Sequence, residues 1–278
     1  MRHGLLDIDD LVRSALREDM SNGDVTTDSL FPDEWEGKAR IISRREGALA
    51  GLPVAYRVFE LLGGLSLSHE IEDGEQIEPD QTILELKGSV KAILRGERTA
   101  LNFLGHISGI ASLTRRYVDA IQGTRARIID TRKTLPGLRA LQKYAVRKGG
   151  GFNHRFTLSN MAMIKDNHIA AYGSIGQAVE KIRASVGPAV RVEVEVDTLG
   201  QLQEALAAEA DVILLDNMTL SEVKQAVKFA TGKAELEVSG NVSLDTVRAY
   251  AETGVDWISV GALTHSAPQM DFSMEIQS

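Results

Sequence analysis

Residues 190–197 read VRVEVEVD, in which valine alternates with a charged residue. Side chains of a β-strand alternate between its two faces, so the valines can pack against helices while the charged residues face an interior. Interior carboxylates are costly unless they are paired or hold a metal. The stretch therefore predicts a strand with an apolar outer face and a charged inner face, the latter formed by Arg191, Glu193, Glu195 and Asp197.

A β-then-α order repeats through the second half of the chain. Strand-like runs begin at positions 127, 161, 190, 212, 235 and 257, in steps of 34, 29, 22, 23 and 22 residues, with helical patterns between them. This order predicts a parallel sheet, and the short, even steps favour a barrel. A complete eight-stranded barrel needs about 200 residues or more, whereas residues 127–261 number only 135. We therefore expect an incomplete barrel.

The first part of the chain has a different pattern. Residues 8–17 have the apolar spacing of an amphipathic helix, and Asp24-Val-Thr-Thr then interrupts the helical pattern. Residues 96–122 are helical again, and their small residues would let another element pack closely. The strand-like runs between these helices are 38–43, 65–71 and 82–87. This order predicts a small antiparallel sheet with helices.

The predicted fold class is thus α/β, in two domains. The N-terminal domain is expected to span residues 1–110, and the incomplete parallel α/β barrel residues 111–265. The C-terminal tail, residues 266–278, is expected to pack back on the first domain.

Composition excludes several classes of protein. The 278 residues contain no cysteine, which excludes disulfides, thiolate metal sites and cysteine nucleophiles. The formal net charge of −8 disfavours general binding to nucleic acid or to an anionic membrane. No apolar run approaches the ~18 residues of a membrane span, and the first residues lack the apolar core of a signal peptide. We expect a cytoplasmic protein with no nucleic-acid or membrane partner.

Polar residues follow the strand-like runs of the second half. Ligands of parallel α/β folds bind at the carboxyl ends of the strands, so these residues are expected to face one common mouth. A glycine-rich loop at 148–155 ends in His154 and Arg155, and its free N–H groups can cradle an anion, although most glycine runs are plain flexible loops. The strand-end segments are Asp130-Thr-Arg-Lys-Thr, Lys165-Asp-Asn-His, Asp216-Asn217, Ser239-Gly-Asn and Gly261.

The acidic residues divide into two groups by their place along the strands. Glu195 and Asp216 lie near the mouth and are expected to be functional. The deeper carboxylates are expected to be structural and to pair with Arg191 or Lys165; they are Glu193, Glu235 and Glu237. His154 taken alone is expected to be a structural hydrogen bonder. A dedicated zinc site is not expected, because the chain has no cysteine and no HExxH pattern.

The chemistry implied by these residues is transfer to or from a highly anionic substrate. The cations suit phosphates or carboxylates, while the carboxylates suit Mg²⁺ accompanying phosphates or a developing sugar cation. No GxGxxG follows a strand and no Walker A sequence is present, so phosphoryl or glycosyl transfer fits better than redox chemistry.

At these residues the chain closely resembles the quinolinate phosphoribosyltransferase family, also called nicotinate-nucleotide pyrophosphorylase (carboxylating). The similar segments occur in order through most of the chain, and jointly they are highly specific. They are Gly23-Asp-Val-Thr-Thr, Glu97-Arg-Thr-Ala-Leu-Asn, Asp130-Thr-Arg-Lys-Thr-Leu-Pro-Gly, Gly149-Gly-Gly-Phe-Asn-His-Arg, Ile164-Lys-Asp-Asn-His, Val192-Glu-Val-Glu, Leu214-Leu-Asp-Asn-Met, Glu237-Val-Ser-Gly-Asn and Ser259-Val-Gly-Ala-Leu-Thr-His.

The resemblance implies an N-terminal α/β sandwich, an incomplete α/β barrel and a homodimer or larger homo-oligomer. It implies a pentosyltransferase that joins quinolinate to phosphoribosyl pyrophosphate, giving nicotinate mononucleotide, pyrophosphate and CO₂ in NAD biosynthesis. It implies Mg²⁺ bound with phosphoribosyl pyrophosphate, held by Glu195 and Asp216 through substrate and water, and no redox cofactor.

The resemblance also implies roles for single residues. Quinolinate would be held by Arg98 from a neighbouring subunit together with Thr131, Arg132, His154, Arg155 and Lys165. The catalytic residues would be Lys133, Glu195 and Asp216, which would also contact phosphoribosyl pyrophosphate. The remaining contacts to that substrate would come from Ser239, Gly240, Asn241, Gly261, Ala262 and His265; some members of the family have a second glycine where Asn241 stands.

Three alternative functions fit the sequence less well. A paralogue encoded with molybdate transport genes would keep the phosphoribosyl site and alter the base pocket, but the four cations expected at quinolinate are all present here. A non-catalytic anion-binding or regulatory protein is disfavoured because Lys133, Glu195 and Asp216 occur together. A Rossmann-like phosphoribosyltransferase carries paired acids and then Thr-Gly after an apolar strand, and residues 212–219 lack that pattern.

Overall fold

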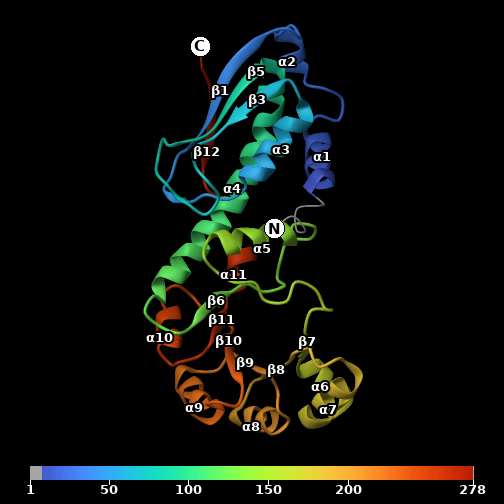
Figure 1. The fold of residues 1–278 in the computed structure, drawn as a ribbon, viewed down its shortest axis with the longest axis vertical. Helices are drawn as coiled ribbons and strands as arrows, with labels where there is room; N and C mark the ends of the chain where they lie inside the picture. The colour runs from blue at the N-terminus through green and yellow to red at the C-terminus, as the bar shows by residue number, and fades with distance from the viewer. Residues whose placement is uncertain (1–7, 278) are drawn as a thin grey trace. The chain divides into compact units, whose positions relative to one another are not determined.

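A computed structural model describes residues 8–277 and divides them into two units (Figure 1). The first unit contains residues 8–115, 135–150 and 266–277, and the second contains 116–134 and 151–265. The expected boundaries, 1–110 and 111–265, differ from these units chiefly at 135–150. Positions 1–7 and 278 of the expected N-terminal domain and tail lie outside the described residues.

Hydrogen bonds explain why residues 135–150 belong to the first unit. This segment contains α5 (Arg139–Lys148). Tyr144 donates to Asp73 Oδ2 at 2.6 Å, and Lys148 Nζ donates to the backbone oxygen of Asp73 at 2.9 Å. Asp73 in turn accepts the backbone N–H groups of Gly51 and Leu52 at the start of α3 (Leu52–Leu62).

The first unit is built on an antiparallel sheet with strand order β12-β1-β5-β3, as the sequence predicts. Its strands are β1 (Glu36–Ser43), β3 (Leu65–Ser68), β5 (Thr82–Ser89) and β12 (Phe272–Gln277), and a second, two-stranded sheet joins β2 (Gly47–Ala48) to β4 (Gln76–Ile77). β12 lies beside β1 along its length, with Ile41 opposite Met274 (Figure 1). The C-terminal strand β12 is thus an edge strand of the sheet that β1, β5 and β3 form.

Helices of the first unit are α1 (Ile8–Asp19), α2 (Val25–Leu30), α3, α5 and most of α4 (Val90–Ala120). Asp24, which was expected to interrupt a helical pattern, begins one: its side chain accepts the Thr27 N–H and caps α2. The small residues of α4 do permit close packing, as predicted. A Cβ on Gly109 would lie 2.1 Å from the Pro268 oxygen, so only glycine lets the chain before β12 cross here.

The second unit is an open parallel sheet of six strands in the order β6-β11-β10-β9-β8-β7 (Figure 1). It confirms the predicted parallel sheet and the incomplete barrel. The strands are β6 (Arg127–Ile129), β7 (Ala162–Ile164), β8 (Val192–Val196), β9 (Val212–Asp216), β10 (Glu235–Ser239) and β11 (Trp257–Ser259). The helices are α6 (Asp166–Tyr172), α7 (Ile175–Ser185), α8 (Leu199–Ala207), α9 (Leu220–Ala230), α10 (Val247–Ala251) and α11 (Ala262–His265).

Strand alternation separates the core from the polar face as predicted. Val192, Val194 and Val196 are at most 1% exposed. On the opposite face the Glu193 side chain is 0% exposed and that of Glu195 is 16% exposed, so exposure rises toward the carboxyl end of β8. No helix among residues 8–277 combines the length and the apolar character that a membrane crossing requires.

Candidate active site

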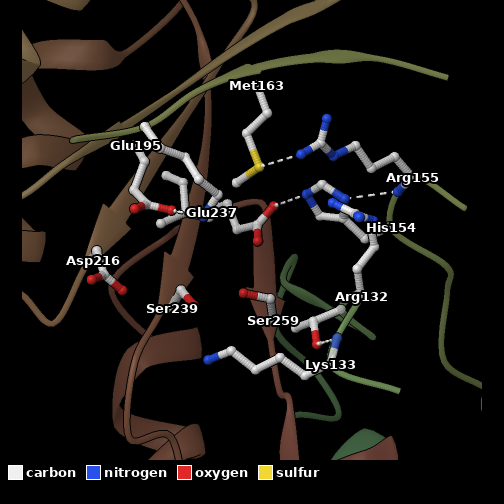
Figure 2. Close-up of a pocket in the computed structure, with 13 residues that line it drawn as sticks. Arg132, Lys133, His154, Arg155, Met163, Glu195, Asp216, Glu237, Ser239 and Ser259 are labelled. Atoms are coloured by element: carbon white, nitrogen blue, oxygen red, sulfur yellow. Dashed lines mark hydrogen bonds and ion pairs between the residues drawn. The ribbon is translucent and has the colours of Figure 1, made fainter. Parts of the chain in front are cut away.

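The carboxyl ends of the parallel strands surround a cavity of about 370 Å³ in the second unit (Figure 2). Glu195 and Asp216 lie on one side of it, and Arg132, His154 and Arg155 lie on the other. The lining residues are Thr131, Arg132, Lys133, His154, Arg155, Met163, Lys165, Glu195, Leu214, Asp216, Glu237, Ser239 and Ser259. The cavity therefore brings together most of the residues singled out in the sequence.

The loop after β6 is held by hydrogen bonds to the backbone of Lys133 and to the side chain of Asp130. The backbone N–H of Lys133 donates to Thr131 Oγ1 at 3.0 Å, and Thr264 Oγ1 donates to the Lys133 carbonyl at 2.8 Å. Asp130 is fully buried and accepts from Asn153 Nδ2 at 2.5 Å and from the His154 N–H at 2.9 Å. One buried carboxylate thus ties the 151–155 segment to the end of β6, just before the loop that carries Arg132 and Lys133.

Arg155 presents part of its guanidinium to the cavity. Its Nη1 donates to the Met161 carbonyl at 3.0 Å and its Nη2 contacts Met163 Sδ at 3.3 Å, while Nε is buried without a hydrogen-bond partner among the described residues. Burial and the nearby charge of Arg132 lower the pKa of Arg155. Arg132 Nε is likewise buried without a partner in the described part of the chain. Two positively charged guanidinium groups that repel each other are suited to a ligand with more than one negative charge.

The carboxylate side of the cavity offers oxygen ligands. Lys165 Nζ donates to Glu195 Oε2 at 2.5 Å. Asp216 Oδ2 accepts from Asn217 at 2.9 Å, and Asp216 lies opposite Ser239 in the sheet. Carboxylate oxygens are the protein ligands that Mg²⁺ prefers, and both carboxylates line the cavity, so this side fits a hydrated Mg²⁺ that arrives with a phosphorylated substrate.

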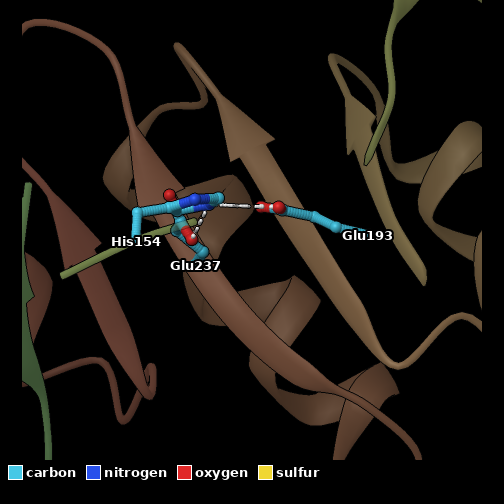
Figure 3. A group of neighbouring side chains, drawn as sticks. All are labelled: His154, Glu193 and Glu237. Carbon is cyan, nitrogen blue, oxygen red and sulfur yellow. Dashed lines mark hydrogen bonds and ion pairs between the residues drawn. The ribbon is translucent and has the colours of Figure 1, made fainter. Parts of the chain in front are cut away.

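Three side chains at the base of the cavity form a buried cluster, drawn in Figure 3: His154, Glu193 and Glu237. His154 Nε2 lies 3.1 Å from Glu193 Oε2 and 3.4 Å from Glu237 Oε2. The expected pairing of both glutamates with Arg191 or Lys165 is therefore wrong. Lys165 pairs with Glu195 instead, whereas Arg191 pairs with Glu235 at 3.0 Å, which confirms the expectation for that third glutamate. The expectation failed because the sequence does not show that the 151–155 loop returns to the sheet.

The cluster holds one proton more than a neutral imidazole and two carboxylates would carry. Burial disfavours the imidazolium, but the two carboxylates outweigh it and raise the pKa of His154 to about 10. Nδ1 accepts the Arg155 backbone N–H at 2.7 Å, so Nε2 is the ring nitrogen that presents a proton to the two carboxylates. Burial, together with the charge of Glu237, raises the pKa of Glu193. The three ligand atoms lie within 4.8 Å of one another and could also hold a metal ion, but their spacing is that of hydrogen bonds.

Several predicted site residues are not among the described residues that line the cavity: Arg98, Gly240, Asn241, Gly261, Ala262 and His265. Arg98 is exposed on α4, in the first unit. Gly261 adjoins the cavity wall, since a Cβ there would lie 3.3 Å from Lys133 Cδ and 3.2 Å from His265 Nε2. Gly240 and Asn241 have φ angles of 93° and 49°, and Asn241 Nδ2 donates to Asn217 Oδ1 at 3.3 Å.

Four lining residues were absent from the predicted site: Met163, Leu214, Glu237 and Ser259. The sheet register could have identified three of them. Leu214 lies between Glu195 and Glu237 in the sheet, and Ser259 extends the inward-facing positions of β11. Met163 lies opposite Glu193, at the same face of β7. The sequence patterns gave the apolar and small residues among these no chemical role.

Comparison with known proteins identifies the family to which the chain belongs. The profile of the quinolinate phosphoribosyl transferase C-terminal domain matches residues 110–275, and that of the N-terminal domain matches residues 24–108. The chain belongs to the quinolinate phosphoribosyltransferase family.

Members of the quinolinate phosphoribosyltransferase family match nearly end to end. "Nicotinate-nucleotide pyrophosphorylase [carboxylating]" of Mycobacterium leprae is 45% identical and covers 96% of each chain. "Probable nicotinate-nucleotide pyrophosphorylase [carboxylating]" of Bacillus subtilis is 43% identical and covers 98% of this chain and 94% of its own. The crystal structure of NadC from Streptococcus pyogenes superposes with a TM-score of 0.95 at 43% identity, covering 98% of this chain and 97% of that one.

Proposed function

We propose that this protein is a quinolinate phosphoribosyltransferase (decarboxylating). The pyridine nitrogen of quinolinate attacks C1′ of phosphoribosyl pyrophosphate, and pyrophosphate leaves with the electrons of the C1′–O bond. The bond between C2 of the ring and its carboxylate then breaks, CO₂ departs, and C2 takes a proton. The products are nicotinate mononucleotide, pyrophosphate and CO₂. Names of relatives 37–45% identical over almost the whole chain support this activity.

The observation that carries the proposal is the division of charge across one cavity. Arg132 and Arg155 each carry a buried Nε without a partner in the described residues, and both line the cavity with Lys133 and Lys165. Two adjacent carboxylates of quinolinate would satisfy such guanidinium groups bidentately. We assign Thr131 and His154 to the same substrate, because both line the cavity together with Arg132 and Arg155.

Glu195 and Asp216 act at the ribose and at the leaving group. Loss of pyrophosphate leaves positive charge on the ribose, which a fixed carboxylate stabilises. The side chain of Glu195 is held by Lys165 at 2.5 Å, so its position is set before the substrate enters. Lys133 would neutralise charge on the departing pyrophosphate. Glu195 and Asp216 would hold Mg²⁺, which would supply further neutralisation of that charge.

We assign the 5′-phosphate of phosphoribosyl pyrophosphate to the ends of β10 and β11. Ser239 lines the cavity, and Gly240 and Asn241 follow it with positive φ angles, a backbone shape that directs N–H groups outward. Gly261 directly precedes α11 and lies close to both Lys133 and His265, the last residue of that helix. Ala262, which begins α11, completes this set.

The proposed working form is a homodimer or larger homo-oligomer in the cytoplasm, in which Arg98 of one subunit serves the site of its neighbour. Arg98 is exposed and belongs to a different unit from the cavity residues, which supports a role at an interface. No nucleic acid or membrane partner is proposed. Light scattering of the purified protein, and cell fractionation, test the assembly and the location.

One assay tests the activity. Quinolinate labelled at its 2-carboxylate is incubated with phosphoribosyl pyrophosphate, Mg²⁺ and the protein, and released CO₂ and nicotinate mononucleotide are measured. The proposal is supported if CO₂ and nicotinate mononucleotide form in equal amounts, and only when phosphoribosyl pyrophosphate, Mg²⁺ and the protein are all present. Binding of phosphoribosyl pyrophosphate without CO₂ release would instead indicate the paralogue with another base, and binding without any turnover a regulatory protein.

A further inference from the structure

The proposed reaction requires a proton at one defined atom. When CO₂ leaves, the electron pair of the broken bond remains on C2 of the pyridinium ring, and a proton must replace the carboxylate. A positioned general acid would prevent CO₂ from recombining with C2. The inference below rests on the proposed function and asks which residue of this chain supplies that proton.

Most cations of the cavity are poor proton donors. The guanidinium groups of Arg132 and Arg155 do not deprotonate in proteins. The ammonium of Lys165 is engaged by Glu195 at 2.5 Å. The buried cluster of His154, Glu193 and Glu237 is therefore the best candidate to hold a transferable proton (Figure 3).

Glu237 is the glutamate of that cluster that reaches the substrate cavity. It lines the main cavity, yet its side chain is only 3% exposed. One of its oxygens, Oε2, lies 3.4 Å from His154 Nε2, while the other, Oε1, is buried with no hydrogen-bond partner among residues 8–277. One oxygen thus contacts the histidine and the other is available to a ligand.

A second cavity lies behind the cluster. It measures about 210 Å³, and Glu237, His154 and Arg155 line both cavities. Its other walls include Arg191, which is exposed and pairs with Glu235 at the amino end of β10. The cluster therefore separates the substrate cavity from a space at the opposite end of the strands, from which it could regain a proton without substrate leaving.

We propose that Glu237 is the general acid that protonates C2 after decarboxylation, and that His154 holds the Glu237 carboxyl group in position. In this step the C2–carboxylate bond breaks, its electron pair stays on C2, and that pair takes the proton from Glu237. Glu237 then recovers a proton from water that enters by the second cavity, which Glu237 lines. No oxidant or reductant is required.

The test separates pyrophosphate release from CO₂ release in single-turnover reactions of the full-length protein. In the wild type the two are equimolar. Glu237→Gln keeps the shape of the side chain but removes the acid, so we expect pyrophosphate release to continue while CO₂ release slows by roughly 10²-fold. The carboxylated mononucleotide should then accumulate and be detected by mass spectrometry. Glu237→Asp, which restores an acid, should restore equimolar release.

Glu235→Gln is the matched control, because Glu235 lies two residues away on the same strand and pairs with Arg191 outside the substrate cavity. It should leave release equimolar. If Glu237→Gln fails to fold, His154→Gln, assayed at saturating quinolinate because His154 is also assigned to that substrate, must show the same accumulation. Equimolar release by folded Glu237→Gln, at full or reduced rate, overturns the inference. Absence of pyrophosphate release by the wild type would instead contradict the proposed function itself.

Discussion

At the scale of single residues, Glu193 and Glu195 point to the same face of β8 but have different surroundings. Glu193 is completely buried against His154, whereas Glu195 is 16% exposed and held by Lys165 at the cavity. Glu195→Gln should lower kcat by about 10²–10³-fold with little change in melting temperature, because it removes an electrostatic contact made to the transition state. Steady-state kinetics and thermal unfolding measure both quantities.

Asp197→Asn is the control for this variant, since Asp197 is the next residue of the same face and is exposed. It should retain wild-type kcat. A large loss of melting temperature with unchanged kcat in Glu195→Gln would show that Glu195 is structural.

The buried cluster predicts a dependence of stability on pH. In the folded protein Glu193 of β8 and Glu237 of β10 raise the pKa of His154 from 6.5 to about 10, with Arg155 as the nearby opposing charge. Between these values the folded state binds more protons than the unfolded state, so the free energy of unfolding is highest below about pH 6.5 and falls as pH rises toward 10. Urea titrations of the wild type and His154→Gln should show a shallower fall in the variant; parallel curves would contradict the assignment.

The paired guanidinium groups predict selectivity for quinolinate over nicotinate, which lacks the 2-carboxylate. Without it, Arg132 or Arg155 would face the cavity without its anionic partner, at a cost of up to about 3–5 kcal/mol. Since about 1.4 kcal/mol corresponds to tenfold, kcat/KM should differ by roughly 10²–10³-fold or more. Phthalate keeps both adjacent carboxylates and should compete with quinolinate. Comparable turnover of the two pyridines would mean that the arginines serve phosphates instead.

At the scale of elements, β12 makes the last residues of the chain part of the first sheet. Phe272 is 7% exposed on β12, whereas Ile276 on the same strand is 50% exposed. Phe272→Ala should lower the free energy of unfolding by about 3–5 kcal/mol, because it removes a large side chain from a packed core. Ile276→Ala is the control and should change it far less. Equal effects in urea titrations would mean that the strand does not anchor the sheet.

Local sequence patterns allowed the strands and helices to be predicted. The features that could not be predicted depend on contacts between residues far apart in the sequence. The alternation in 192–196 and the even steps between strands gave the parallel sheet, because both follow from the geometry of one strand or one β-α unit. The placement of α5 in the first unit depends on Asp73, which lies 71 positions before Tyr144. The partners of His154 lie 39 and 83 positions away, so no local pattern could reveal that this residue joins two strands.

At the scale of the whole molecule, the proposed assembly decides where each site obtains its residues. Lys133 lines the cavity in the second unit, and Arg98 belongs to the first unit. If Arg98 serves the neighbouring subunit, a site lacks it when the partner carries the substitution. Arg98→Ala and Lys133→Ala should each have little activity alone, because each removes a cation that faces an anionic substrate.

Mixing the two variants under conditions of subunit exchange distinguishes the assignments. In a heterodimer, the barrel of the Arg98→Ala chain keeps Lys133 and receives Arg98 from its partner, so one of its two sites is intact. Random exchange makes about half of the dimers heterodimers, and activity should recover to about a quarter of the wild-type value. If Arg98 served its own chain, each site of the heterodimer would lack one cation and no activity would return. Native mass spectrometry must confirm the exchange, because only proven heterodimers without activity contradict a shared site.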